Sequence, residues 1–307
     1  NKIYTVCSIY AAKTSVKKYE AMRAALCEDK RVRGLLQFYG ANRTGRWAGR
    51  LVQVQNLPRN YIKDLDLAKE LVKSDDLEML EMLFGNVPDT LSQLIRTSFI
   101  ATKGAKFIVA DFSAIEARVI AWLAGEKWRL EVFKTHGKIY EASASQMFKI
   151  PLESVDKDLR QKGKVAELAL GYQGGPNALV KMGAIKMGLS EAELPDIVDK
   201  WRAANKAIIS YWDLINRSAI DCIMGLGPQK TYHGITFRMG NGLLYVDLPS
   251  GRSLSYVRPN LVQGNYGYSV VYEGMNQTTK QWGRQDTYGG KLVENIVQAV
   301  ARDCLAV

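Results

Sequence analysis

The stretch LRQKGKVAELALGYQGG, residues 159–175, places four side chains at an unbroken spacing of four: Arg160, Lys164, Leu168 and Tyr172. In a helix, residues at this spacing stack along one face. Two cations one turn apart can grip successive phosphates, and a tyrosine ring gives a base a surface to stack on. The row therefore predicts a nucleotide-binding helix, although a surface helix with mixed residues at this spacing is the common alternative.

A second stretch, VADFSAIEARV at residues 109–119, joins two predicted elements. Residues 106–111 form a short apolar run rich in β-branched residues, which predicts a buried strand ending at Asp111. Residues 113–125 follow with helical periodicity and stop at a glycine. A carboxylate at a strand end is accessible yet rigidly held, so Asp111 is a candidate ligand for a hard divalent cation. The alternative is that Asp111 or Ser113 caps the next helix.

The remaining patterns predict a mixture of helices and strands. Apolar residues recur at helical spacing in four segments, namely residues 15–30, 62–86 with a break near Ser74, most of 127–224, and 289–307. Turn residues and alternation predict loop and short strand at residues 40–60 and β-hairpins at residues 226–261.

The charge of the chain is large and unevenly distributed. Its 307 residues allow two or three packed subdomains and carry a net charge of +11. Residues 11–50 have a net charge of +7 and residues 60–90 a net charge of −5. This segregation favours a surface that faces a polyanion, and charge that serves solubility is the alternative.

Composition restricts the metal and the compartment. The four cysteines form no CxxC pair, which predicts reduced thiols in a cytoplasmic protein. With only two histidines, a His-rich zinc site is not expected, and carboxylates would favour Mg²⁺ or Mn²⁺. No apolar run reaches the roughly 20 residues of a membrane span, and the first residues lack the apolar core of a signal peptide, so we expect no membrane partner.

Taken together, the two opening stretches resemble motifs of the family A, polymerase I-like DNA polymerases. DFSAIEARVIAWLAG is similar to the first palm motif, D-Y-S-x-I-E-x-R, and Arg160, Lys164 and Tyr172 fit the fingers helix, R-x3-K-x7-Y. Four further stretches resemble family segments in the right order: TGRWAGRLVQVQNLP at 44–58, IRTSFIATKGAKFIVAD at 95–111, GKIYEASASQMFKIPLESV at 137–155 and ENIVQAVARD at 294–303. The resemblance covers roughly residues 13–307 and is nearest to the phage-encoded branch.

The resemblance implies an α+β fold, a right-hand polymerase palm of antiparallel sheet with helices plus mostly helical fingers, present in incomplete form. The implied domains are a thumb remnant at residues 1–40, a first part of the palm at 41–126, the fingers at 127–262 and a second, truncated part of the palm at 263–307.

It also implies a role for individual nucleotide-site residues. Asp111 would bind two Mg²⁺ ions and face the two cations of the fingers helix. Arg160 and Lys164 would hold the triphosphate, with Lys164 as the proton donor to pyrophosphate. Glu116 would lie under the sugar and reject a 2′-hydroxyl. The other implied nucleotide-site residues are Ser113, Leu168, which stands where Phe or Tyr is common, and Tyr172, which would guard the template base.

The remaining implied roles concern DNA and local structure. Arg118 would pair locally within the palm. Residues expected to contact primer-template DNA are Arg46, Arg50, Gln55, Asn56 and Gln298.

The implied function is DNA-templated DNA polymerisation, in which dNTPs are transferred to a primer 3′-hydroxyl by a two-metal mechanism, in the host cytoplasm if the chain is phage-encoded. The family's second metal carboxylate comes from a His-Asp-Glu hairpin, but both histidines here are followed by glycine and no acid follows Asp303. We therefore expect a C-terminally truncated fragment that polymerises poorly alone. The alternatives are one half of a split polymerase, completed by a second chain that supplies the palm hairpin, or a non-catalytic remnant that binds primer-template DNA. An unrelated Mg²⁺ nuclease is disfavoured because no D-x-D or D-x-E pair lies near Asp111.

Overall fold

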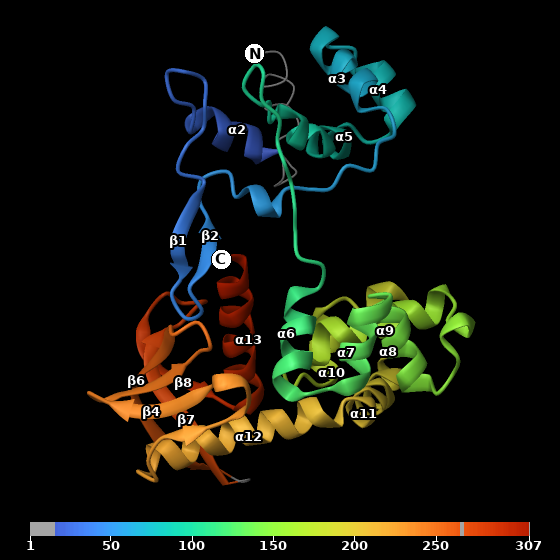
Figure 1. Ribbon diagram of the computed structural model, residues 1–307. Helices are drawn as coiled ribbons and strands as arrows, with labels where there is room; N and C mark the ends of the chain where they lie inside the picture. The colour runs from blue at the N-terminus through green and yellow to red at the C-terminus, as the bar shows by residue number, and fades with distance from the viewer. Residues whose placement is uncertain (1–15, 265–266, 307) are drawn as a thin grey trace. The chain divides into compact units, whose positions relative to one another are not determined.

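The chain divides into two compact units, residues 1–111 and residues 112–307. The structure is a computed structural model that describes residues 16–264 and 267–306 (Figure 1). The first fifteen residues of the expected thumb remnant, with Lys13 of the basic segment, lie outside the described residues. The expected four-part division has other boundaries and stays a prediction.

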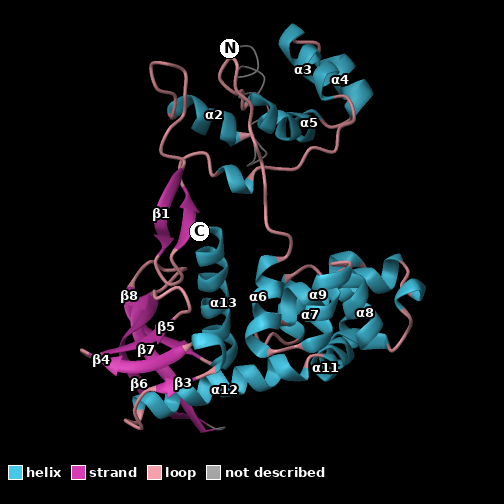
Figure 2. Ribbon diagram, in the orientation of Figure 1, coloured by secondary structure: helices cyan, strands magenta, loops and turns pink. Residues whose placement is uncertain are grey.

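The first unit holds short helices and one hairpin (Figures 1 and 2). Its elements are α2 (Lys17–Ala24), β1 (Leu36–Ala41), β2 (Arg46–Gly49), α3 (Leu65–Ser74), α4 (Leu77–Phe84) and α5 (Val87–Leu94). The predicted break near Ser74 is confirmed, because Asp75 has a φ of 68° and Asp76 caps α4 by accepting from the amide of Met79. The helices α3, α4 and α5 bury one apolar face each in a common core around Leu80 and Leu91.

The predicted buried strand at residues 106–111 is wrong. No strand of the described residues pairs with this segment, and its side chains are exposed, with Phe107 at 64%, Ile108 at 85% and Val109 at 91%. A strand forms only where a neighbouring strand takes up its backbone hydrogen bonds, so an apolar, β-branched composition is not sufficient. Asp111 is therefore an exposed residue in an extended segment rather than the end of a buried strand.

The second unit combines a helical half with a six-stranded sheet (Figure 2). Its helices are α6 (Ile115–Ala124), α7 (Lys127–Thr135), α8 (Ile139–Phe148), α9 (Lys157–Leu170), α10 (Pro176–Lys181), α11 (Leu194–Ala204), α12 (Lys206–Ile223) and α13 (Gly289–Leu305). Its strands are β3 (Gln229–Lys230), β4 (Thr236–Gly240), β5 (Leu243–Asp247), β6 (Ser253–Gly264), β7 (Gly267–Met275) and β8 (Trp282–Thr287).

The sheet is an antiparallel meander in which each strand pairs with the next along the chain. The hairpins predicted at residues 226–261 are confirmed, whereas β7 and β8 had no prediction. Inward side chains alternate along β4 and β5, where Phe237, Leu244 and Val246 are fully buried.

One core joins the helical half to the sheet. The long helix α12 runs from the helices to the sheet, and α13 packs beside it and α6 (Figure 1). Gly289 begins α13 against α12, because an added Cβ there would lie 2.3 Å from the carbonyl oxygen of Trp212. The helix that carries the predicted nucleotide contacts, α9, is thus held within one continuous core.

Candidate nucleotide-binding site

The helix α9 presents the two predicted phosphate-binding cations on one face. It begins at the cap residue Asp156, whose carboxylate accepts from the amide of Leu159 at 2.8 Å. Arg160 and Lys164 follow one turn apart, and Leu168 is 48% exposed one turn further on. The helix ends at Leu170, so Tyr172, predicted to continue the same row, lies in the following turn.

The two cations differ in their surroundings. Arg160 donates from Nε to Oε1 of Glu141 at 2.7 Å, and its guanidinium carbon lies 5.6 Å from the ring centre of Tyr140. Lys164 is half-buried and has no hydrogen-bond or ion-pair partner among the described residues. Its ammonium group is therefore available to a ligand, whereas a ligand of Arg160 would meet a carboxylate that already occupies Nε.

Tyr172 connects the end of α9 with the first turn of α6. Its hydroxyl donates to Oε2 of Glu116 at 3.0 Å, and its ring packs against the main core. The next residue, Gln173, accepts a hydrogen bond from the amide of Gly290 at 3.0 Å. A Cβ at Gly290 would lie 2.5 Å from the carbonyl oxygen of Tyr172, so only glycine allows α13 to approach this turn so closely.

Arg118 and Ser113 contact each other at the start of α6. The side chain of Arg118 donates from Nε to the carbonyl oxygen of Ser113 at 2.8 Å, and its guanidinium carbon lies 4.4 Å from the ring centre of Phe133. Ser113 itself is exposed and does not cap α6. The local role expected for Arg118 is compatible with these contacts and stays a prediction.

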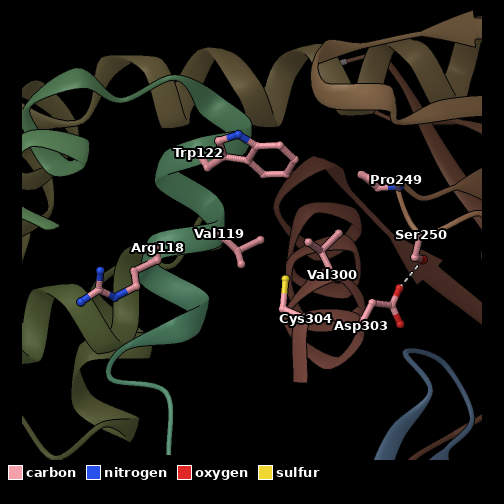
Figure 3. A pocket seen from close by; sticks show the side chains of 8 residues that line it. All are labelled: Arg118, Val119, Trp122, Pro249, Ser250, Val300, Asp303 and Cys304. Atoms are coloured by element: carbon pink, nitrogen blue, oxygen red, sulfur yellow. Dashed lines mark hydrogen bonds between the residues drawn. The ribbon is translucent and has the colours of Figure 1, made fainter. Parts of the chain in front are cut away.

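A mostly apolar cavity of about 480 Å³ is lined by residues of α6 and α13 and by Pro249 and Ser250. Figure 3 shows Val119 and Trp122 of α6 facing Val300 and Cys304 of α13. Of the site residues predicted from the sequence, only Arg118 lies on its wall. The cavity therefore lies apart from the cations of α9.

The predicted DNA-contacting residues of the first unit lie on the β1–β2 hairpin and the turn that follows it. Arg46, Arg50, Gln55 and Asn56 are all exposed. The side chain of Gln55 folds against β2, where a Cβ at Gly49 would meet it at 2.2 Å. The two arginines are thus exposed at the second strand of a short hairpin and directly after it.

Gln298, the remaining predicted DNA contact, lies in the second unit on α13. It is half-buried and donates to Oε1 of Glu294 at 3.3 Å, one turn earlier on the same helix. Its contact with DNA stays a prediction.

The donor set does not fit a metal centre. Among residues 16–264 and 267–306, no three His, Cys, Asp or Glu side chains gather closely enough to hold a metal ion. Asp111 is a single exposed carboxylate, and one carboxylate cannot anchor two dications. We therefore derive no step through Mg²⁺, and the metal role of Asp111 stays a prediction, as does its position facing the cations of α9.

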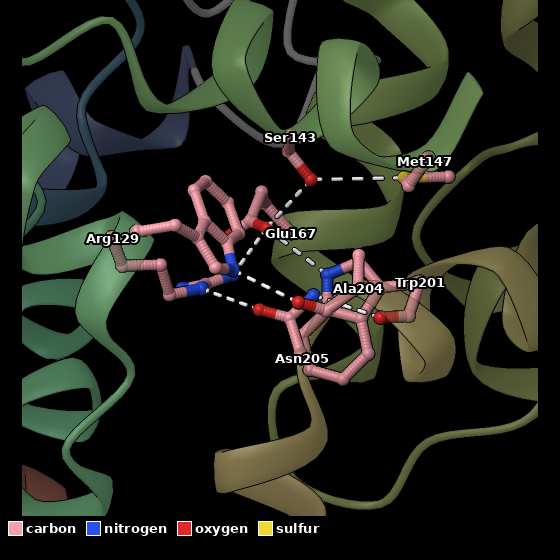
Figure 4. A network of polar contacts seen from close by, with 8 residues as sticks. Arg129, Ser143, Met147, Glu167, Trp201, Ala204 and Asn205 are labelled. Atoms are coloured by element: carbon pink, nitrogen blue, oxygen red, sulfur yellow. Dashed lines mark hydrogen bonds and ion pairs between the residues drawn. The ribbon is translucent and has the colours of Figure 1, made fainter. Parts of the chain in front are cut away.

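A buried polar network that the sequence analysis did not identify fixes α9 to its neighbours (Figure 4). Glu167 pairs with Arg129 of α7, and the two side chains are only 4% and 2% exposed. The same carboxylate oxygen accepts from Ser143 of α8 at 2.8 Å and from Trp201 of α11 at 3.0 Å. Glu167 lies next to Leu168 in the chain, so one side of α9 faces solvent while the other is anchored to three helices.

Two other cavities are lined by charged side chains. One, of about 490 Å³, surrounds the start of α9 and is lined in part by Arg160, Glu141 and Glu153. The other lies within the first unit, measures about 710 Å³ and includes Arg23, Lys30, Arg31 and Arg33 in its wall.

Comparison with known proteins places these features in a family. Residues 10–223 match the sequence profile of DNA polymerase family A. The chain belongs to DNA polymerase family A. The match includes the predicted palm motif and fingers helix, so the family resemblance is confirmed.

Relatives within DNA polymerase family A agree with this assignment. The chain is 63% identical to the DNA polymerase of Bacillus phage SP02 over 300 residues, which are 96% of this chain and 46% of that protein. It is 37% identical to the thermostable DNA polymerase I of Thermus aquaticus over 89 residues, 28% of this chain and 11% of that protein. The chain thus spans about half the length of the phage relative.

A solved structure shares the family fold. The POL domain of Pol1 from M. smegmatis, in complex with DNA primer-template and dNTP, superposes with a TM-score of 0.57 at 17% identity and covers 95% of this chain and 39% of that one. The expected α+β polymerase fold is thereby confirmed. Within the part of the chain that the structure describes, no helix has both the length and the apolar character needed to cross a membrane.

Proposed function

We propose that this chain binds a deoxynucleoside triphosphate on α9 and serves template-directed DNA synthesis. The single observation that carries the proposal is the face of α9 on which exposed Arg160 and half-buried Lys164 lie one turn apart, with the Tyr172–Glu116 hydrogen bond just after the helix. Two cations at this spacing match a polyphosphate, and an aromatic ring at the end of the helix matches a base.

In the proposed reaction, the primer 3′-hydroxyl loses its proton to water and its oxygen attacks the α-phosphorus of the dNTP. A new P–O bond to the primer forms and the bond to pyrophosphate breaks, so negative charge develops on the leaving pyrophosphate. Arg160 and Lys164 stabilise that charge, and Lys164 donates the proton that the leaving group takes up. Glu116, held by Tyr172, would lie under the sugar and exclude a 2′-hydroxyl.

Primer-template DNA is the proposed macromolecular partner. The M. smegmatis POL domain with the same fold was solved with primer-template DNA and dNTP, which supports this choice. The first unit adds exposed Arg46 on its hairpin, Arg50 directly after it, and a cavity whose wall includes four further basic side chains, two of them paired with Asp29. Because phosphate contacts would supply most of the affinity, we expect DNA binding to weaken steeply as salt is raised.

We further propose that the chain alone extends a primer poorly. Among its described residues, no three His, Cys, Asp or Glu side chains gather to hold a metal ion, whereas two-metal nucleotidyl transfer needs ligands for two dications. A second polypeptide that supplies the missing carboxylates, in the host cytoplasm, would complete such a site. The same observation favours the second candidate function, a remnant that binds primer-template DNA without catalysis.

Two measurements on the purified chain test these proposals. The first is binding of a fluorescent primer-template with and without the dNTP that pairs with the next template base. The second is extension of that primer in Mg²⁺. Tighter DNA binding with the correct dNTP than with a mismatched dNTP, together with weak extension, supports a polymerase.

Other outcomes separate the alternatives. Salt-sensitive DNA binding that no dNTP alters would identify the non-catalytic remnant. Robust extension by the chain alone would refute the inference that its own carboxylates are insufficient.

A further inference from the structure

The first turn of α8 lies against the first two turns of α9, where the phosphate-binding cations begin. Gly163 of α9 is buried at this crossing, and a Cβ there would lie 2.3 Å from the carbonyl oxygen of Tyr140. The crossing therefore brings Glu141 beside Arg160 through the packing of two helices rather than through a chance contact of two flexible side chains.

The contact between Glu141 and Arg160 is partly shielded from water. Oε1 of Glu141 lies 2.7 Å from Nε of Arg160, and the side chains are 24% and 44% exposed. The ring of Tyr140 lies beside the same guanidinium group. Burial, the largest single influence, raises the pKa of Glu141. The hydrogen bond from Arg160, the backbone hydrogen bond and the positive charges of Arg160 and Lys138 together outweigh burial, so the pKa lies below its ordinary value and the carboxylate is charged at neutral pH.

We propose that the Glu141 carboxylate competes with the triphosphate of a bound dNTP for Arg160, and that this competition lowers the affinity of the site for dNTP. This inference rests on the proposed function, because it takes α9 as the triphosphate site. A triphosphate that engages Arg160 through Nε must first displace the Glu141 carboxylate, whereas Lys164 on the same face needs no such displacement. The ion pair thus lowers the affinity of the resting site while keeping the guanidinium oriented.

The cavity at the start of α9 provides a matched control. Glu153 lines the same cavity as Glu141 and is exposed, but it forms no hydrogen bond or ion pair among the described residues. Glu141→Gln and Glu153→Gln remove the same charge from the same cavity, and only the first weakens a hydrogen bond to Arg160, because the glutamine amide keeps a neutral acceptor there. If removal of negative charge alone raises the affinity, both variants should bind more tightly. If competition for Arg160 is the cause, only Glu141→Gln should do so.

The experiment is calorimetric titration of the full chain, in EDTA and low salt, with dATP and separately with inorganic tripolyphosphate. We expect Glu141→Gln to bind both probes about two- to fivefold more tightly, which is the range expected for an ion pair of this exposure. Glu153→Gln should show less than half of that gain. Arg160→Met should weaken binding, and Glu141→Gln should have no effect in the Arg160→Met background.

The outcomes separate this inference from the proposed function. If Arg160→Met binds both probes as tightly as the unmodified chain, the triphosphate site itself is misassigned. If Arg160→Met weakens binding but Glu141→Gln and Glu153→Gln gain the same affinity, the triphosphate site is supported and the proposed competition is refuted. Glu141→Ala, with a thermal melt to verify folding, removes the acceptor altogether and should bind both probes at least as tightly as Glu141→Gln.

Discussion

Replacement of Glu167 by alanine should destabilise the second unit more than the same replacement of an exposed charged residue would. Arg129 is only 1% exposed, and the substitution leaves its guanidinium group without a counter-charge. It also leaves the donors of Ser143 and Trp201 without their acceptor. Removing one partner of a buried ion pair costs about 3–5 kcal/mol. A typical domain has only about 5–15 kcal/mol of total stability, so the loss is a large fraction of it.

Urea unfolding followed by circular dichroism and by tryptophan fluorescence measures this loss. The control is Asp196→Ala, which removes the exposed ion pair with Lys200 on α11 and should cost less than about 1 kcal/mol. Glu167→Gln keeps a neutral acceptor and should lose about half as much as Glu167→Ala, because charge-assisted hydrogen bonds are roughly twice as strong as neutral ones.

The double variant Arg129→Met with Glu167→Leu separates the cost of an orphaned charge from the value of the pair. Because the apolar replacements leave no buried charge, the double variant should lie much nearer to the unmodified chain than Glu167→Ala does. If Glu167→Ala lowers the free energy of unfolding no more than Asp196→Ala does, the Glu167 network is solvated and its burial does not stabilise the fold.

Three further predictions follow from the geometry of α9 and its neighbours. Gly163→Ala should lower stability by about 1–3 kcal/mol in a thermal melt, because its Cβ would collide with α8, whereas Gly171→Ala, with open space around it, should change stability little. Lys164→Ala should weaken dATP binding by about tenfold or more, because a hydrogen bond to a charged group is lost, and unchanged binding in a titration would contradict its role. Hydrogen bonds from the Ser190 backbone and side chain and from Lys162 lower the pKa of Glu193 from 4.5 to about 2, so the stability that it contributes is fully present above about pH 4.5 and is lost as pH falls toward 2. Glu193→Gln should therefore flatten the dependence of the melting temperature on pH in that window, and an unaltered pH profile would refute this assignment.

The helices were predictable where the spacing of residues on one face, or one capping residue, determines where the helix lies along the chain. The spacing of four between Arg160 and Lys164 is a property of the helix alone, so the sequence places both side chains on one face of α9 correctly. The break near Ser74 was equally local, because an aspartate with positive φ followed by an aspartate cap ends one helix and begins another.

The strands were less predictable because a strand depends on a partner elsewhere in the chain. The apolar run at residues 106–111 has the composition of a strand and finds no partner among the described residues. The strand β7 has a mixed composition and forms nonetheless, because β6 and β8 pair with it on both sides. Composition therefore indicates which segments can be strands, and topology decides which of them are.

Within the site, no local pattern of residues indicates contacts between distant helices. Glu141 lies 19 residues from Arg160, and nothing in the local pattern distinguishes it from a solvated helix charge. Glu167 and Arg129 are 38 residues apart, and an acid amid the charged residues of α9 would ordinarily face water. Both contacts require helices to cross, and Gly163 makes the crossing of α8 and α9 possible that brings Glu141 to Arg160.

The shared acceptor at Glu167 has a consequence for experiments on conformational change. One carboxylate oxygen links α7, α8, α9 and α11, so we expect these four helices to move together as one rigid body. Two dyes attached within this rigid body would keep a constant separation when nucleotide arrives. A dye on this rigid body paired with one on the sheet, across α12, would register any rotation, and the rigid body could be transplanted between relatives as one cassette.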